Sequence, residues 1–392
     1  MSHHVLIAGG GIGGLTAALC CAARDMQVDV FEQAAAFGEV GAGLQLSPNC
    51  SRVLHALGLQ DALAAHAFLP QSIEMRAWRD GRVLQATPLG AEATRRYGFP
   101  YYHIHRADLI GVLLAACRRR GNISLHADSP VERVVAHQQG VTLRVKGRDW
   151  QGDVLVGADG IRSVVREHLF GAEAPVFTGN VAWRGLVPAS RLPAGLVRPV
   201  ATAWWGPRKH FVHYFVRRGE LVNCVCVVEK QGWEVESWSA RGEHAELKAD
   251  FRGWHRTVRE LIANMDPDAC FKWALYDRPP MPRWTEGHAT LLGDACHPTL
   301  PFMAQGAAMA IEDAAVLAAC LARATAIPAA LERYEALRRE RTAGVQTGSR
   351  RNATVFHLSG PAAWVRNRAL KLASGSAMER LYAYDPLAAV AG

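Results

Sequence analysis

No run of apolar residues in this sequence approaches the roughly 20 that a helix needs to cross a bilayer. Residues 1–4 are too short and too polar a start for a secretory signal. Hydrophobic residues make up 49% of the chain and charged residues 20%, a balance typical of a globular protein. A length of 392 residues suffices for two domains or one large intertwined pair. We therefore expect a cytoplasmic protein with no membrane span.

The chain also lacks the cysteine and histidine spacings of a metal or disulfide framework. It has nine cysteines, an odd number. Cys224 and Cys226 fall in a predicted strand and have no histidine pair at zinc-like spacing. Several others fall within apolar helical patterns and are typical of small core residues in a reducing compartment: Cys20, Cys21, Cys117 and Cys320. We expect no metal site.

The formal net charge of +8 raises the question of nucleic-acid binding. The basic clusters at residues 118–120 and 338–341 lie at predicted helix ends or on helical faces of mixed charge, where solvation and the helix dipole explain them. No nucleic-acid-binding module is recognisable. A positive field would also attract a small anionic substrate or a pyridine nucleotide. We expect no nucleic-acid partner.

What the sequence does contain is a nucleotide-binding pattern at its start. An apolar run at residues 5–8 leads into Gly9-Gly10-Gly11-Ile12-Gly13-Gly14 and a helical run at residues 15–24. Gly9 permits the tight turn, Gly11 lets the backbone approach a pyrophosphate, and Gly14 lets the helix pack closely on the sheet. Glu32 ends the next apolar run, where it would meet ribose hydroxyls. The pattern predicts a dinucleotide bound at the positive end of this helix.

Two later segments have similar strand-to-helix turns. Residues 153–166 read as a buried strand followed by Gly157-Ala158-Asp159-Gly160, and residues 289–315 as a strand that ends at Gly293-Asp294, a proline-containing loop and a helix. Asp294 is placed to bond a ribityl or ribose hydroxyl. The amides of Gly306 and Ala307 would point a helix N-terminus at an electron-rich group. Each turn alone is also explained by an aspartate that caps a helix. The three in this order predict a nucleotide domain completed by distant segments.

Between these segments the pattern changes to an antiparallel sheet. Runs rich in valine and aromatic residues cover residues 180–187, 199–205, 209–217 and 220–228, and residues 71–88 read as a hairpin. We predict an α/β fold in which a Rossmann-like domain is interleaved with an antiparallel-sheet substrate domain, followed by C-terminal helices. The nucleotide domain is assigned to residues 1–70, 101–175 and 276–345, the sheet domain to residues 71–100 and 176–275, and the C-terminal helical segment to residues 346–392. The predicted helices include residues 47–57, 59–66, 106–120, 245–264 and 305–322, and residues 131–145 read as a strand pair.

Taken together, these three turns resemble the fingerprints of single-component flavoprotein aromatic hydroxylases, the family that includes p-hydroxybenzoate hydroxylase. Further likeness to salicylate hydroxylase, 3-hydroxybenzoate 6-hydroxylase and 6-hydroxynicotinate 3-monooxygenase comes from residues 41–49, 105–109, 209–215 and 381–385. The resemblance covers nearly the whole chain. It implies an FAD-binding Rossmann-like domain and an enzyme that is an FAD-dependent aromatic-ring monooxygenase.

The resemblance also implies which residues bind FAD. Glu32 would bind the adenosine ribose, Arg106 the ribityl–pyrophosphate region, Val131 the adenine through its backbone, and Asp294 the ribityl chain. The other candidates lie in the three turns: Gly9, Gly11, Gly13, Gly14, Asp159, Gly306 and Ala307. NADH or NADPH would reduce the flavin, O2 would add to form a hydroperoxide, and its distal oxygen would attack the ring of a small aromatic acid. The presence of one dinucleotide motif argues against a separate nicotinamide domain.

The strand at residues 209–216 carries the candidate catalytic residues. Alternation places His210, Val212 and Tyr214 on one face and Phe211, His213 and Phe215 on the other. The apolar partners of His213 indicate a packing face, and a lone strand histidine is more often structural than catalytic. His210 and Tyr214 match pocket positions of the related enzymes, so we assign them as catalytic. His297 is expected to orient its loop, and Gln45 and Tyr101 to line the pocket.

Two departures from the related enzymes bear on the substrate. The 3-hydroxybenzoate enzymes have a glutamine where this chain has Pro301, and the hydroxynicotinate enzymes have histidines where it has Phe302 and Gln45. The loop is more similar to that of salicylate hydroxylase, so salicylate is favoured, with 3-hydroxybenzoate and hydroxynicotinate as alternatives. A flavin reductase that does not hydroxylate, or a nucleotide-binding regulator, is the alternative from another class. The choice of NADH or NADPH and of monomer or homodimer stays open.

Overall fold

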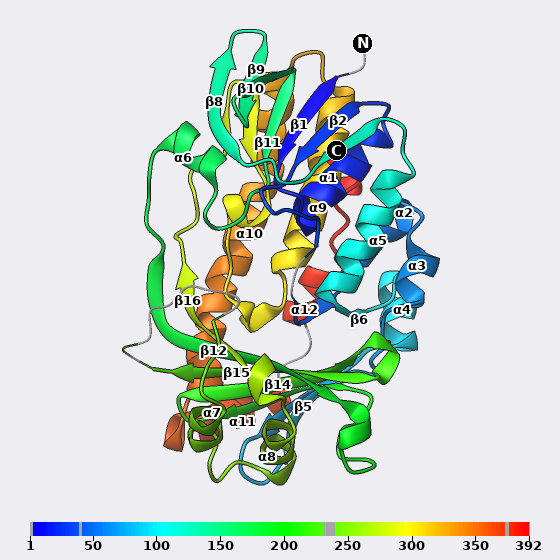
Figure 1. Ribbon diagram of the computed structural model, residues 1–392. Helices are drawn as coiled ribbons and strands as arrows, with labels where there is room; N and C mark the ends of the chain where they lie inside the picture. The colour runs from blue at the N-terminus through cyan, green and yellow to red at the C-terminus, as the bar shows by residue number, and fades with distance from the viewer. Residues whose placement is uncertain (1–2, 39–40, 231, 233–239, 373–375, 392) are drawn as a thin grey trace.

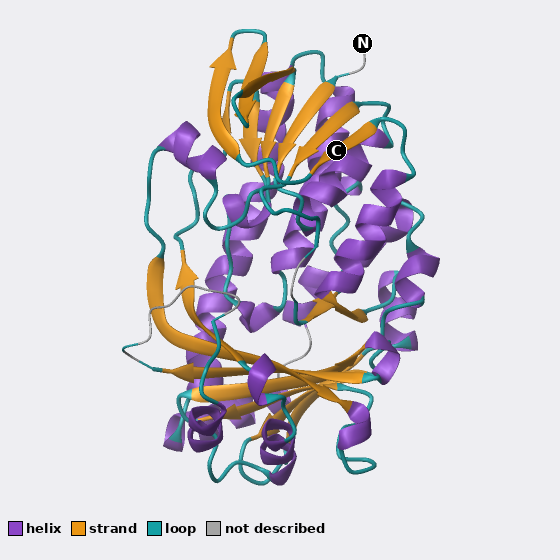
Figure 2. Ribbon diagram, viewed as in Figure 1, coloured by secondary structure: helices purple, strands orange, loops and turns teal. Residues whose placement is uncertain are grey.

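The computed structural model describes residues 3–38, 41–230, 232, 240–372 and 376–391. A nucleotide-binding sheet lies at one end of the molecule and a broad, curved sheet at the other, with helices between them (Figure 1). Figure 2 shows the same division by secondary structure. The predicted fold class, a Rossmann-like domain interleaved with a second sheet, is confirmed.

The nucleotide-binding sheet has six strands in the order β17-β18-β11-β1-β2-β7. They are Thr285–Glu286 (β17), Ala289–Leu291 (β18), Val154–Gly157 (β11), His4–Ala8 (β1), Gln27–Phe31 (β2) and Ile123–His126 (β7). All neighbouring pairs are parallel except β17 and β18. Parallel strands covered on both faces are nearly continuous in apolar residues, as β1 and β11 are. Three distant chain segments therefore build one sheet.

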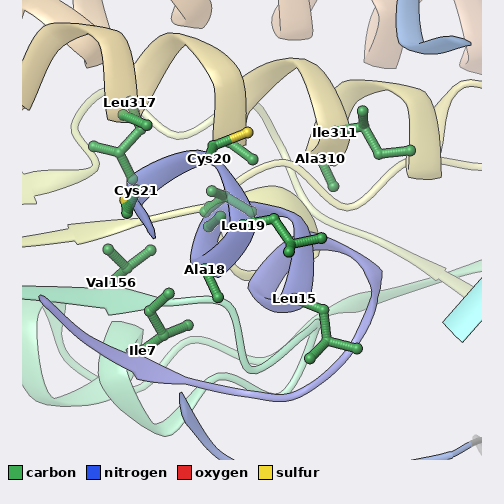
Figure 3. Close-up of a cluster of buried hydrophobic side chains, with 14 of the residues drawn as sticks. Ile7, Leu15, Ala18, Leu19, Cys20, Cys21, Val156, Ala310, Ile311 and Leu317 are labelled. Carbon is green, nitrogen blue, oxygen red and sulfur yellow. The ribbon is translucent and has the colours of Figure 1, made fainter. Parts of the chain in front are cut away.

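Small side chains let two helices approach this sheet and one another. Helix α1 (Ile12–Ala22) packs against α9 (Gly306–Arg323). Figure 3 shows Cys20 and Cys21 of α1 near Ala310 and Leu317 of α9, whereas Ala18 points from α1 toward the strands. Ile7 of β1 and Val156 of β11 lie beneath α1. All nine cysteines of the chain are free and buried. Cys20, Cys21, Cys117 and Cys320 are small core residues, as the sequence predicted.

The antiparallel sheet beside β11 has one strand more than the sequence indicated. Val131–His137 (β8), Gly140–Val145 (β9) and Arg148–Gly152 (β10) pair in the order β10-β9-β8. The strand pair at residues 131–145 is correct, but β10 was missed. Its sequence, Arg-Asp-Trp-Gln-Gly, has one hydrophobic side chain and so lacks an apolar alternation.

The second large sheet has seven strands in the order β16-β12-β15-β14-β13-β4-β5. They are Phe271–Asp277 (β16), Val176–Pro188 (β12), Leu221–Glu229 (β15), Lys209–Val216 (β14), Ala201–Gly206 (β13), Ser72–Ala77 (β4) and Val83–Pro88 (β5). It is antiparallel except for the pair β4 and β13. The hairpin at residues 71–88 thus forms one edge of this sheet. Strand β16, which the sequence reading missed, forms the other edge.

Helices α7 (His244–Asp250) and α8 (Arg256–Ala263) cover the outer face of this sheet (Figure 1). The sequence predicted one helix over residues 245–264, but the chain turns between Phe251 and His255 and makes two. Phe211, Trp183 and Cys224 point from the sheet into the same core as Phe251 and Leu261. The opposite face of the sheet is turned toward the nucleotide-binding domain.

The remaining elements join the two ends of the molecule. Helix α10 (Ile327–His357) is a continuous helix of 31 residues that contacts β17, β13 and β14 and runs through the domain boundary predicted at residue 345. None of the helices in the described ranges is long and apolar enough to cross a membrane. A small sheet pairs Gly43–Leu46 (β3) with Tyr102–His105 (β6). The other helices are Pro48–Ala56 (α2), Gln60–Ala64 (α3), Ala91–Tyr97 (α4), Arg106–Arg118 (α5), Val164–Phe170 (α6), Gly360–Leu372 (α11), Ser376–Tyr382 (α12) and Ala388–Ala391 (α13).

Candidate active site

One cavity of about 960 Å³ extends from the nucleotide-binding sheet to the inner face of β14. Gly9 and Glu32 line it at the first end, and His210 and Tyr214 line it at the second. All the predicted site residues except Gly14 line this cavity: Gly9, Gly11, Gly13, Glu32, Gln45, Tyr101, Arg106, Val131, Asp159, His210, Tyr214, Asp294, Pro301, Phe302, Gly306 and Ala307. The structure therefore brings together residues that are up to about 300 positions apart in the chain.

The glycine-rich turn has no room for side chains. Gly9 has a φ of +104°, and a Cβ atom there would lie 2.4 Å from the carbonyl oxygen of Ala158. A Cβ atom on Gly14 would lie 1.9 Å from the carbonyl oxygen of Gly9. Gly14 thus acts at the contact between helix and turn, which explains why it is absent from the cavity wall. Such a turn lets backbone amides approach a phosphate group closely.

Glu32 is held at the end of β2 by two backbone amides. Its Oε2 accepts a hydrogen bond from the Gly10 amide and its Oε1 accepts one from the Ala34 amide, each at 2.8 Å. The carboxylate is therefore fixed beside the glycine turn and at the cavity wall. This is the position that the sequence predicted for a contact to ribose.

The other two turns place carboxylates against the same cavity. Asp159 accepts a hydrogen bond from the Val165 amide at 3.1 Å through Oδ2, whereas its buried Oδ1 has no partner within the described structure. Asp294 lies deep in the protein and is open to the cavity, and burial raises its pKa although His297 and Arg106 act to lower it. Burial lowers the pKa of Arg106, which Asp294 in turn raises. The closed glycine turn and these polar groups fit a dinucleotide such as FAD.

Helix α9 begins at the middle of the cavity. Gly306 and Ala307 are its first residues and line the cavity wall. The first amides of a helix have no partners within it, so this end can stabilise an electron-rich group. His297 does not line the cavity: its Nε2 lies 2.6 Å from Oδ2 of the buried Asp313. That bond ties the loop after β18 to α9, in line with the loop-orienting role expected of His297.

Strand β14 separates its two histidines as the alternation predicted. His210, Val212 and Tyr214 line the cavity. His213 points the other way, where its ring lies 6.2 Å from the Trp204 ring and its two nitrogens have no hydrogen-bond partner among the described residues. Burial lowers the pKa of His213 to about 3. Its surroundings are those of a packed core residue.

His210 combines burial with a polar partner. Burial lowers its pKa well below the usual range, and nearby His357 lowers it further. Its Nδ1 lies 2.9 Å from Nε2 of His357, and its ring centroid lies 5.1 Å from that of Phe302. Also on the cavity wall, Tyr101 donates a hydrogen bond to Oε1 of Gln45 at 2.7 Å. Burial raises the pKa of Tyr214, so its phenol stays protonated and can donate.

The sequence reading missed several residues of the cavity wall. Arg184 and Trp273 come from β12 and β16, with the Arg184 guanidinium 4.5 Å from the Trp273 ring centroid. The alternation of side chains along β12 could have predicted Arg184. Because Trp183 packs in the core on the outer face of the sheet, its neighbour Arg184 must point to the opposite face, toward the cavity. The other missed wall residues have no motif, since they come from separate elements: Met75, Gln85, Thr202, Val225, Asn352, Phe356 and Met378.

Comparison with known proteins agrees with this geometry. The family described as FAD binding domain matches residues 2–349. The chain belongs to this family. It is similar to 3-amino-4-hydroxybenzoate 2-monooxygenase PtnB3 of Streptomyces platensis, with 41% identity over 94% of this chain and 93% of the relative. It is also similar to 3-hydroxybenzoate 6-hydroxylase of Polaromonas naphthalenivorans (strain CJ2), with 38% identity over 96% of this chain and 93% of the relative.

A solved structure extends the likeness to the fold. The substrate complex of a salicylate hydroxylase superposes with a TM-score of 0.84 at 28% identity, covering 100% of this chain and 97% of that one. The predicted resemblance to single-component flavoprotein aromatic hydroxylases is confirmed. The protein is accordingly an FAD-dependent aromatic-ring monooxygenase, as the sequence indicated.

Proposed function

We propose that this flavin monooxygenase uses NADH or NADPH and O2 to hydroxylate a small aromatic acid whose ring hydroxyl lies beside His210. The observation that carries the proposal is the position of His210 and Tyr214. They present an imidazole and a phenol to the far end of a cavity whose near end has the glycine turn. The neighbouring wall is largely apolar and includes Val212, Phe302 and Trp273. A flat ring with one ionisable hydroxyl fits such surroundings.

The chemistry divides between cofactor and protein. Bound FAD supplies the transfer of electrons from the nicotinamide and the activation of O2. FAD would be held by the three turns that contain Gly9–Gly14, Asp159 and Asp294. The side chains of Glu32 and Arg106 would also contact it. The N-terminus of α9 at Gly306 would stabilise negative charge beside the cavity.

The protein's own contribution to the reaction is a base and a dry cavity. His210 is neutral because it is buried, so a ring nitrogen can accept a proton from the substrate hydroxyl. Its Nδ1 is occupied by His357, which leaves Nε2 for the cavity. Removal of this proton makes the ring more electron-rich and so more reactive toward an electrophilic oxygen. Apolar residues such as Phe302 exclude water from the reacting atoms.

Two observations favour different substrates. Leu300, Pro301 and Phe302 offer no side-chain donor or acceptor, which favours salicylate, whose two polar groups are adjacent. The wall also includes Gln85 and Asn352, whose side chains carry amide groups. Such groups can pair with a second polar substituent, and the relatives named for 3-amino-4-hydroxybenzoate and 3-hydroxybenzoate act on rings of that kind. Both substrate types are therefore candidates.

A substrate panel tests the proposal. Purified holoenzyme is given NADH or NADPH with salicylate, 3-hydroxybenzoate, 3-amino-4-hydroxybenzoate or 6-hydroxynicotinate, and the products are identified under ¹⁸O2. We expect one aromatic acid to stimulate nicotinamide oxidation and to gain one labelled oxygen. Nicotinamide oxidation that yields only hydrogen peroxide with every compound would favour a flavin reductase. A protein that binds no FAD and oxidises no nicotinamide would contradict the enzyme assignment.

A further inference from the structure

Beyond the cavity wall, His210 is the first of three side chains joined by hydrogen bonds. Nδ1 of His210 lies 2.9 Å from Nε2 of His357, and Nδ1 of His357 lies 2.8 Å from Oε1 of Glu229. His210 belongs to β14, His357 ends α10, and Glu229 ends β15. The side chain of His357 is 3% exposed and that of Glu229 is 36% exposed. The series of bonds therefore begins at the cavity and ends at solvent.

The polar partners also fix where the protons lie. A carboxylate only accepts hydrogen bonds, so His357 carries its proton on Nδ1 and presents a lone pair at Nε2. His210 must then donate from Nδ1, and its Nε2 keeps a lone pair that faces the cavity. Through two successive hydrogen bonds, Glu229 thus holds His210 in the tautomer with its proton on Nδ1, whose free Nε2 can accept a proton from the substrate.

Other contacts hold the series in place. Arg366 donates to the carbonyl oxygens of Val355 and Phe356 at 2.7 and 3.2 Å, which stabilises the end of α10. The Arg208 amide donates to the His357 carbonyl at 3.1 Å, and the Arg208 Nε lies 3.2 Å from the second oxygen of Glu229. Among the described residues, the charged or titratable groups that face His357 are Arg208, Arg366, Glu229 and His210. The rings of Phe302 and Phe356 cover the His210 side.

We propose that His357 and Glu229 form a proton relay that carries the substrate's hydroxyl proton from His210 to the protein surface. This inference rests on the proposed function, because it requires a ring hydroxyl at Nε2 of His210. His357 and Glu229 do not line the cavity and act through His210, so they are positioning residues. Without such a path the proton would stay on a buried imidazole, and a charge there is costly.

The transfer balances at each atom. The substrate O–H bond breaks as a bond forms from that proton to Nε2 of His210. The Nδ1–H bond of His210 breaks as the proton moves to Nε2 of His357, and the Nδ1–H bond of His357 breaks as the proton moves to Glu229. Glu229 then loses its proton to bulk water. The reverse passage returns a proton to the product oxygen and restores both tautomers.

The test compares four new variants and His210→Ala with the wild-type holoenzyme, each assayed with an acid that the wild type hydroxylates in the substrate panel. Glu229→Gln and His357→Gln keep a polar side chain but cannot pass the proton on. Glu286→Gln is the matched control, since Glu286 is also a half-exposed, ion-paired glutamate but lies on β17. Glu229→Asp tests rescue by a shorter carboxylate. FAD content and the melting temperature of each variant report folding.

We expect Glu229→Gln and His357→Gln to lower kcat by about 10–100-fold, less than the roughly 10²–10⁴-fold typical for loss of the base itself, with KM and FAD content unchanged. For a substrate whose ring hydroxyl ionises within the assay range, their rates should rise toward wild type at high pH. Glu229→Asp should recover part of the loss, and Glu286→Gln should match wild type. Wild-type rates and pH profiles in both glutamine variants, alongside a slow His210→Ala, would overturn the relay but not the proposed function. Failure of the wild type to hydroxylate any of the four acids in the substrate panel would overturn the function on which the relay rests.

Discussion

Arg338 of α10 and Asp313 of α9 form an ion pair, with 2.7 Å between Nε and Oδ1, and neither side chain is exposed. Glu312, also fully buried, makes a second pair with Arg338 at 2.6 Å. Asp313 additionally bonds His297, which belongs to the loop behind Asp294. This network joins the helix whose first turn borders the cavity to the long helix α10 and to the loop after β18.

Removal of Arg338 should therefore destabilise the protein strongly. Arg338→Leu removes the cation that Glu312 and Asp313 share, so that of their ionisable partners Glu312 keeps Arg341 and Asp313 keeps His297. We expect a loss of about 3–5 kcal/mol in the free energy of unfolding. The neighbouring Arg339 pairs with Glu335 at a half-exposed position, so Arg339→Leu should cost less than about 1 kcal/mol. Urea denaturation of both variants measures the difference. Equal losses of stability in the two variants would show that the buried network contributes no more than the half-exposed pair of Arg339 and Glu335.

The fit of the glycine turn predicts a selective loss of flavin. A Cβ atom on Gly14 would overlap the Gly9 carbonyl, so Gly14→Ala must displace α1 from the turn. We expect this variant to purify with little FAD, as measured by the 450 nm absorbance relative to protein. Gly111, in α5, is a helical glycine with open space at its Cβ position, and Gly111→Ala should keep its FAD and gain up to about 1 kcal/mol of stability. A fully loaded Gly14→Ala would contradict the steric argument.

The two histidines of β14 should differ in what they control. His210→Ala removes the proposed base, and hydroxylation should slow by about 10²–10⁴-fold while FAD stays bound. His213→Ala leaves a hole in the core beside Trp204 and should lower the melting temperature with a much smaller effect on kcat. Product formation and thermal unfolding, measured on both proteins, separate the two effects. The opposite pattern would mean that the catalytic assignment of His210 is wrong.

Selectivity should respond to the loop after β18. Pro301→Gln adds a donor and an acceptor to the cavity wall, and these can pair with a hydroxyl distant from the carboxylate. We expect the ratio of kcat/KM for 3-hydroxybenzoate to that for salicylate to rise by about tenfold, which corresponds to one added hydrogen bond. Coupled product formation with both acids measures the ratio. An unchanged ratio would place the second polar substituent elsewhere.

Buried neutral histidines predict a specific pH dependence of stability. Burial lowers the pKa of His213 to about 3, below the value near 6.5 of an unfolded histidine. As the pH falls, His213 therefore takes up a proton in the unfolded chain before it does so in the folded protein. The contribution of neutral His213 to stability is fully present above about pH 6.5 and declines as the pH falls toward 3. His213→Leu should remove about 1.4 kcal/mol per pH unit from the slope between pH 6 and 4.5. Denaturation at several pH values measures it, and an unchanged slope would indicate that His213 is charged in the folded state.

The sequence predicted most of the nucleotide end of the site because local motifs define that end. Gly9, Asp159 and Asp294 each follow a buried strand, and the carboxyl ends of parallel strands meet at one edge of a sheet. The face of His210 was also predictable, since alternation along β14 depends only on neighbours in sequence. Its bond to His357 was not predictable, because 147 residues separate the two and His357 lies at the end of a helix with no motif. Residues such as Gln85 and Asn352 likewise reach the cavity only through the packing of distant elements.

Helix α10 has a consequence for engineering of this enzyme. With 31 residues it is about 46 Å long, and it places Arg338 in the buried network and His357 against the sheet of the substrate domain. The seven-stranded sheet is therefore not an exchangeable module. A chimera that takes residues 71–100 and 176–275 from a relative would keep Asn352, Phe356 and His357 of this chain against a foreign β14. Transfer of substrate preference between such enzymes requires the second half of α10 to move with the sheet.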